Sequence, residues 1–62
     1  MNSKEIVKKL MANGFYKKSQ NGTSHLKMTN GTLITVIPMH GKDDLGIGLI
    51  KAIERQTQIK LR

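Results

Sequence analysis

The fold of this chain is decided by residues 21–31, which read Asn-Gly-Thr-Ser-His-Leu-Lys-Met-Thr-Asn-Gly. An Asn-Gly pair at each end is typical of a tight hairpin turn in which both central residues have positive φ. Between the turns, apolar Leu26 and Met28 alternate with polar neighbours, and a period of two predicts a half-buried strand. If Leu26 and Met28 face the core, His25 and Lys27 project from the open face of the strand.

Helical patterns lie at both ends of the chain. Residues 3–13 carry apolar side chains at helical spacing. Asn2 or Ser3 can cap this helix, and Glu5 stands three residues after Asn2, as in a capping box. A second helix is expected to begin near residues 45–47 and to end at about residue 57, with Asp44 as its cap.

Two further strands are expected between the helices. Residues 15–20 follow the first helix directly and read as a mostly polar edge strand. Residues 32–37 are rich in β-branched side chains and end at Pro38, so we expect them at the centre of the sheet. The order helix, three strands, helix predicts an α+β fold, one domain over residues 1–62, in which both helices cover one face of an antiparallel meander.

Composition narrows the classes of function. The chain has 62 residues, no cysteine and a net charge of +7, so disulfides and thiolate zinc sites are excluded. No apolar run is long enough for a membrane span and no signal peptide follows Met1, which fits a cytoplasmic protein without membrane contact. A small domain this basic is usually drawn to a polyanion, most often nucleic acid, although lysines also solubilise surfaces.

His25 is the best candidate for chemistry. Two histidines and four carboxylates offer too few ligands for a metal site, and no phosphate-binding glycine loop is present, so no cofactor is expected. Cleavage of RNA needs none, because the 2′-hydroxyl is an internal nucleophile and imidazole can carry the proton. Lys27 would neutralise the phosphorane. The competing interpretation is a solvated surface histidine.

Lys17 and Lys18 in the first strand have two interpretations. They would contact RNA phosphates, or they would only discourage pairing of an exposed sheet edge. The residues alone leave both open.

Residues 21–28, followed downstream by Pro38-Met39-His40, resemble the HicA family of toxins, which are small messenger-RNA interferases of prokaryotic toxin–antitoxin pairs. The resemblance implies a fold like that of double-stranded-RNA-binding domains, a catalytic role for His25, and a HicB-type antitoxin that masks the active site. Many members have one residue between the glycine and the histidine, where this chain has Thr23 and Ser24. We expect Ser24 to contact RNA, and His40 is a further possible contact.

Two functions from different classes therefore remain. The first is a metal-independent ribonuclease that cleaves messenger RNA. The second is a non-catalytic RNA-binding module of the double-stranded-RNA-binding type, which reads duplex shape and phosphates. Such a module would usually carry a basic cluster at the start of its last helix. Asp43 and Asp44 occupy that region with only Lys42 nearby, which favours the enzyme.

Overall fold

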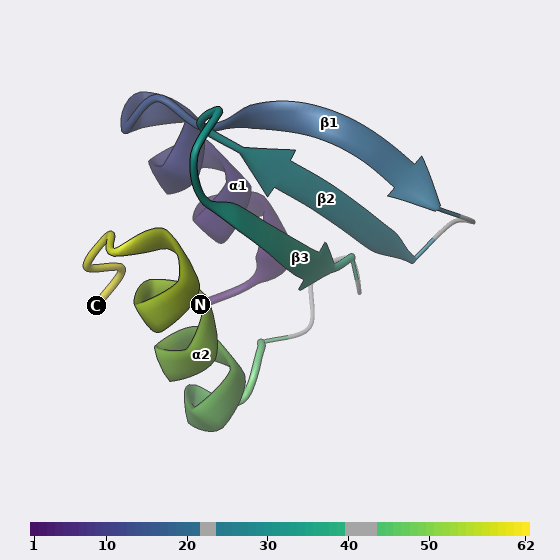
Figure 1. Cartoon of the computed structure of the whole chain (residues 1–62). Coiled ribbons are helices and arrows are strands. Elements are labelled where there is room, and N and C mark those ends of the chain that lie inside the picture. The colour runs from purple at the N-terminus through teal and green to yellow at the C-terminus, as the bar shows by residue number, and fades with distance from the viewer. Residues whose placement is uncertain (22–23, 40–43) are drawn as a thin grey trace.

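The computed structural model describes residues 1–21, 24–39 and 44–62. It contains α1 (Ser3–Ala12), β1 (Tyr16–Asn21), β2 (His25–Thr29), β3 (Ile34–Pro38) and α2 (Ile47–Thr57), in the predicted order (Figure 1). The predicted α+β fold is confirmed, and its order is that of double-stranded-RNA-binding domains. Gly22, Thr23, and residues 40–43 with His40 and Lys42 lie outside the described residues.

The three strands form one antiparallel sheet in the order β1-β2-β3. β2 is therefore the central strand, and the expectation that residues 32–37 lie at the centre is wrong. In a meander the strand that is second in sequence is also second in space, whatever the β-propensity of the third. The β-branched side chains of β3 serve another purpose, because β3 packs against α2, and Thr35 and Ile37 are buried there.

The turn between β2 and β3 differs from the predicted one. Gly31 has a φ of 96°, but Asn30 does not have positive φ, so this is no two-residue turn with two left-handed centres. Instead the Asn30 side-chain oxygen accepts hydrogen bonds from the backbone N–H groups of Thr32 and Leu33, at 2.9 and 2.7 Å. The loop is longer as a result, and β3 starts at Ile34.

The first helix begins as predicted. The Asn2 side chain accepts from the Glu5 N–H and the Glu5 side chain accepts from the Asn2 N–H, both at 3.0 Å. Gly14, with a φ of 89°, allows the chain to leave the helix. Phe15 lies before β1 and is buried, so the strand starts one residue later than predicted.

The predicted cap of the second helix is wrong. Gly46 is the N-cap of α2 and makes no side-chain hydrogen bond. Asp44 lies two residues earlier, where its backbone pairs with Asn2 and its Oδ1 lies 3.3 Å from the amino group of Met1. Asp44 thus ties the segment before α2 to the chain's N-terminus.

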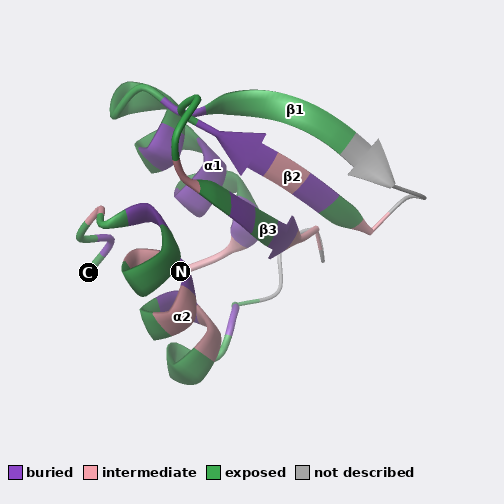
Figure 2. Ribbon diagram, viewed as in Figure 1, coloured by how far each residue is buried: buried purple, intermediate pink, exposed green. Residues whose placement is uncertain are grey.

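One face of the sheet is buried and the other is open. Leu26 and Met28 of β2 and Thr35 and Ile37 of β3 are buried (Figure 2). The residues that alternate with them along the two strands are more exposed, except Thr29, which is also buried. The apolar core that covers this face comes from both helices and the C-terminal tail. The fully buried apolar side chains are Ile6 and Leu10 of α1, Ile53 of α2 and Leu61 of the tail, together with Met28 and Ile37 of the sheet itself.

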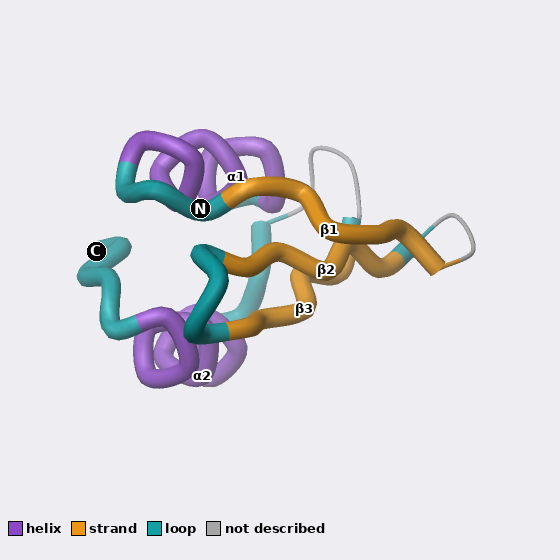
Figure 3. Tube along the Cα trace, turned by 45° about the horizontal axis from the view of Figure 1, so that its top comes forward, coloured by secondary structure: helices purple, strands orange, loops and turns teal. Residues whose placement is uncertain are grey.

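The C-terminal tail, residues 58–62, lies between the two helices (Figure 3). Leu61 is 1% exposed, and its carbonyl accepts a hydrogen bond from Lys9 Nζ on α1 at 3.1 Å. Glu54 of α2 accepts from the N–H groups of Leu61 and Arg62, at 2.8 and 3.2 Å. These hydrogen bonds, led by that from Leu61, lower the pKa of Glu54.

Replacing Met28 by alanine should destabilise the protein strongly, and replacing His25 should not. Met28 is 0% exposed, so Met28→Ala leaves a cavity and costs about 2–5 kcal/mol of unfolding free energy. His25→Ala changes an exposed side chain and should cost no more than about 0.5 kcal/mol. Urea unfolding of both variants measures the difference. Equal destabilisation would mean that the register of β2 is wrong.

Glu54→Gln should make stability less sensitive to acid. The pKa of Glu54 is lower in the folded than in the unfolded protein, so its contribution is present above the unfolded pKa and disappears as pH falls through the folded pKa. The parent should therefore lose more stability than Glu54→Gln between about pH 7 and about pH 3. Urea unfolding across this range tests the effect, and parallel curves would contradict it.

Candidate functional site

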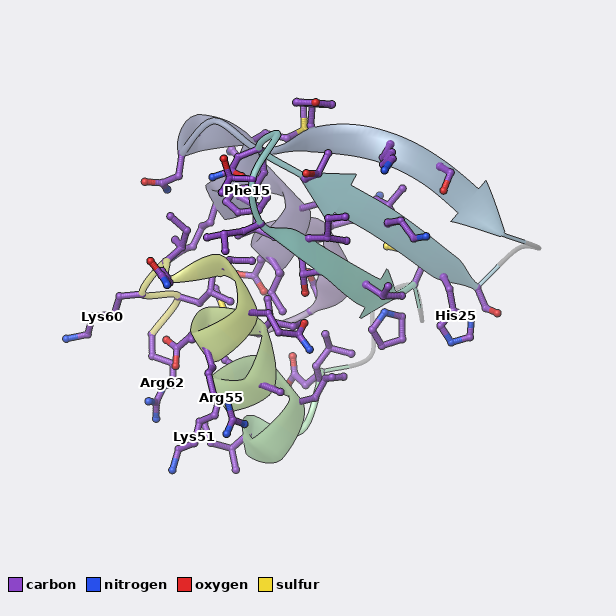
Figure 4. The ribbon with its side chains drawn as sticks, in the orientation of Figure 1. Phe15, His25, Lys51, Arg55, Lys60 and Arg62 are labelled. Carbon is purple, nitrogen blue, oxygen red and sulfur yellow. The ribbon has the colours of Figure 1, made fainter. Side chains whose placement is uncertain are left out.

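His25 begins the central strand and is exposed at one end of the sheet (Figure 4). Its orientation follows from its neighbour, because Leu26 is 3% exposed and belongs to the core. Adjacent residues of a strand point to opposite faces, so the imidazole projects from the open face. The flanking positions are Asn21 in β1 and Pro38 in β3.

Ser24 lies directly beside the imidazole. Its hydroxyl oxygen is 3.3 Å from His25 Nδ1, and this contact leaves Nε2 as the ring nitrogen that is available to a ligand. The Ser24 carbonyl also accepts the Met39 N–H at 2.7 Å, which extends the β2–β3 ladder past the strand ends. A fixed backbone and a hydroxyl partner together restrict the ring.

Lys27 lies on the same face, two residues along β2. This spacing corresponds to ~7 Å along a strand, which a lysine side chain can span. Lys27 is half-buried and stands across from Ser19 in β1 and Val36 in β3. The structure thus brings Ser24, His25 and Lys27 together on one open surface.

The lysine pair of β1 is placed differently. Lys17 pairs with Met28, whose side chain is in the core, and cross-strand partners point to the same face. Lys17 therefore lies at the exposed edge of the helix-covered face and not beside His25. Lys18 falls at a register shift between Lys17 and Ser19. Both are exposed, but the sheet does not group Lys17 with the histidine.

Apolar side chains also occupy the open face. Val36 is 42% and Ile34 48% exposed, and Tyr16, which is paired with Thr29 in the same register, is 54% exposed. Sequence analysis missed this group, because four of the five residues of β3 are apolar and periodicity cannot say which face they occupy. The place of Ile34 and Val36 on the open face follows only from the pairing of β3 with β2, in which Val36 lies opposite Lys27.

The open face is a surface and not a cavity. No pocket is found in the part of the chain that the structure describes. Within the same residues, no three histidine or acidic side chains lie close enough to hold a metal ion together. None of the described helices is long and apolar enough to cross a membrane. A ligand of this face must be a molecule that binds to an exposed, basic and partly apolar strand surface.

Comparison with known proteins assigns the family. Comparisons with curated proteins and with solved structures returned no match. A model of the family described as the HicA toxin of bacterial toxin–antitoxin systems matches residues 3–59, from the start of α1 to beyond the end of α2. The match includes Ser24, His25 and Lys27, and covers nearly the whole length of the fold. The chain therefore belongs to the HicA toxin family.

Proposed function

We propose that this toxin is an endoribonuclease that cleaves messenger RNA in the cytoplasm, with His25 as general acid and base. The observation that carries the proposal is the arrangement on β2. His25 is exposed, has the Ser24 hydroxyl at Nδ1, and shares its face with Lys27. The buried side chain of Leu26, the next residue in β2, keeps the imidazole on the open face, where it is accessible to a ligand.

The imidazole can perform the two proton transfers. In the neutral imidazole whose Nδ1–H donates to Ser24, Nε2 accepts the proton of the RNA 2′-hydroxyl. The 2′-oxygen attacks the adjacent phosphorus at the same time. The bond from phosphorus to the 5′-oxygen then breaks, and the imidazolium returns the proton to that leaving oxygen. The products are a 2′,3′-cyclic phosphate and a 5′-hydroxyl, and no outside reactant is required.

Lys27 would stabilise the charge that develops between these two transfers. The phosphorane has more negative charge on its non-bridging oxygens than the starting phosphodiester, and an ammonium fixed nearby favours it. Lys27 is half-buried, which lowers the effective dielectric around its charge and strengthens this interaction. The Ser24 hydroxyl would contact the RNA or hold the ring.

Membership of the family implies an antitoxin partner, and we propose that it is a HicB-type protein that covers the open face. The support is the exposed apolar group on that face, Tyr16, Ile34 and Val36. Apolar and aromatic side chains are typical of the centre of a protein interface. An antitoxin seated there would exclude RNA from His25.

His25→Ala should abolish cleavage and toxicity while the protein stays folded. Loss of a general acid and base typically lowers the rate by ~10²–10⁴-fold. His25→Ala and Thr32→Ala, a matched control on the exposed β2–β3 loop, should be compared with the parent by RNA cleavage, RNA binding and thermal melting. A folded His25→Ala protein that still cleaves RNA would refute the assignment. An inactive parent that binds RNA would support the non-catalytic alternative.

Cleavage should continue in excess EDTA and should leave 2′,3′-cyclic phosphate ends. Both expectations follow from attack by the 2′-hydroxyl with imidazole as the proton carrier. The same RNA with 2′-deoxyribose at the cleaved position should be resistant. Strict dependence on added magnesium, or cleavage of the 2′-deoxy substrate, would contradict this mechanism.

A further inference from the structure

Four basic side chains gather on α2 and the tail, at the end of the molecule away from His25. Lys51 and Arg55 lie one turn apart on α2, and Lys60 and Arg62 belong to the tail. All four are exposed, and Figure 4 shows them pointing outward, whereas His25 lies at the far end of the sheet. We call these four residues the C-terminal basic surface.

The tail half of this surface is held in place by the core. Leu61, between Lys60 and Arg62, is 1% exposed, so its side chain anchors the tail. Glu54 binds the N–H groups of Leu61 and Arg62, and Lys9 Nζ donates to the Leu61 carbonyl. The backbone beside both cations is therefore ordered before any ligand binds, which lowers the entropy cost of binding.

Most of the positive charge on this surface is not neutralised within the molecule. Glu54 is the one carboxylate of α2, and it lies 3.2 Å from the Arg62 guanidinium while it also holds the tail backbone. In the described ranges, no carboxylate lies within salt-bridge distance of Lys51, Arg55 or Lys60. These three cations are available to an anionic partner.

The surroundings of the surface favour RNA over a protein as that partner. Protein interfaces are organised around apolar and aromatic anchors. The large exposed apolar residues of the described chain are Met11, Tyr16, Ile34, Val36 and Ile47. Only Ile47 belongs to α2, where it occupies the first turn, and none belongs to the tail. Cations without an apolar centre match the phosphates of a nucleic acid backbone, which Arg and Lys both bind.

We propose that the C-terminal basic surface binds phosphates of the RNA substrate. These phosphates belong to an RNA segment that flanks the nucleotides at His25. Lys51 and Arg55 are ~6 Å apart along the helix axis, a separation suited to neighbouring phosphates of one strand. The molecule measures 28 × 27 × 17 Å, so an RNA that contacts both ends must extend well beyond the cleaved bond. The inference rests on the proposed action on RNA.

The binding test uses Lys51→Ala/Arg55→Ala and a matched control, Lys4→Ala/Lys8→Ala. The control removes two exposed cations four residues apart on α1, so both proteins lose the same charge. Both are prepared with His25→Ala and titrated with oligouridine of about 16 nucleotides, within the range of single-strand site sizes. Two lost phosphate contacts should lower the slope of log affinity against log salt by ~1.4 and weaken binding on the order of 10-fold at about 0.1 M salt. The control should keep the parent slope.

Equal slopes for the two double variants would overturn the inference, because only net charge would then matter. It would also be overturned if Lys51→Ala/Arg55→Ala bound RNA like the parent and lost affinity for the antitoxin instead. Thermal melting establishes that each variant is folded. Lys60→Ala, which removes no hydrogen bond within the described chain, provides a second test and should lower the slope by ~0.7.

The length of the RNA separates this inference from the ribonuclease proposal. With His25 restored, Lys51→Ala/Arg55→Ala should raise KM for RNA of about 16 nucleotides at unchanged kcat, and should have no effect on RNA of about 4 nucleotides. An equal effect on both lengths would overturn the inference. If the parent cleaves no RNA, the ribonuclease proposal fails, whereas the salt slopes of the His25→Ala proteins still decide whether the surface binds RNA.

Discussion

The burial of Leu26 and Met28 is the constraint on which the rest of the structure depends. β2 has a neighbour on each side, and its two apolar side chains are 3% and 0% exposed beneath the helices. A slip of one residue would bury the imidazole and expose both apolar side chains, at a cost of several kcal/mol in a small core. The core thus decides on which face of the strand His25 lies, and the contact of Ser24 with Nδ1 leaves Nε2 available to a ligand.

A core this small also needs its last residues. Leu61 fills the space between the helices, and Glu54 and Lys9 hold the backbone around it from α2 and α1. The same contacts that close the core present Lys60 and Arg62 to solvent. Stability and the arrangement of positive charge therefore depend on one segment, and a substitution that loosens the tail would affect both.

Local and alternating signals in the sequence predicted most of the fold. The capping box, Gly14 and the period of two in β2 depend on neighbouring residues only, and the structure has each of them. The errors concern competition between distant partners. Asp44 pairs with the N-terminus instead of capping α2. The central strand is β2 and not β3, because the strands lie in the sheet in chain order. The open-face positions of His25 and Lys27 followed from alternation. Alternation puts Ser24 in the series of Leu26 and Met28, so its contact with the imidazole required the structure, and the position of Lys17 required the register of β1.

The proline at the end of β3 limits how another chain can attach to the sheet. The Met39 N–H bonds to Ser24, so the alternation of the ladder directs the backbone nitrogen of Pro38 outward, along the free edge of β3. A proline nitrogen cannot donate, so a fourth strand added along this edge would lack a hydrogen bond beside His25. β-Augmentation is therefore disfavoured at this end of the sheet. On the β3 side, a partner that reaches the histidine would therefore approach over the open face of the sheet and recognise side chains, not backbone.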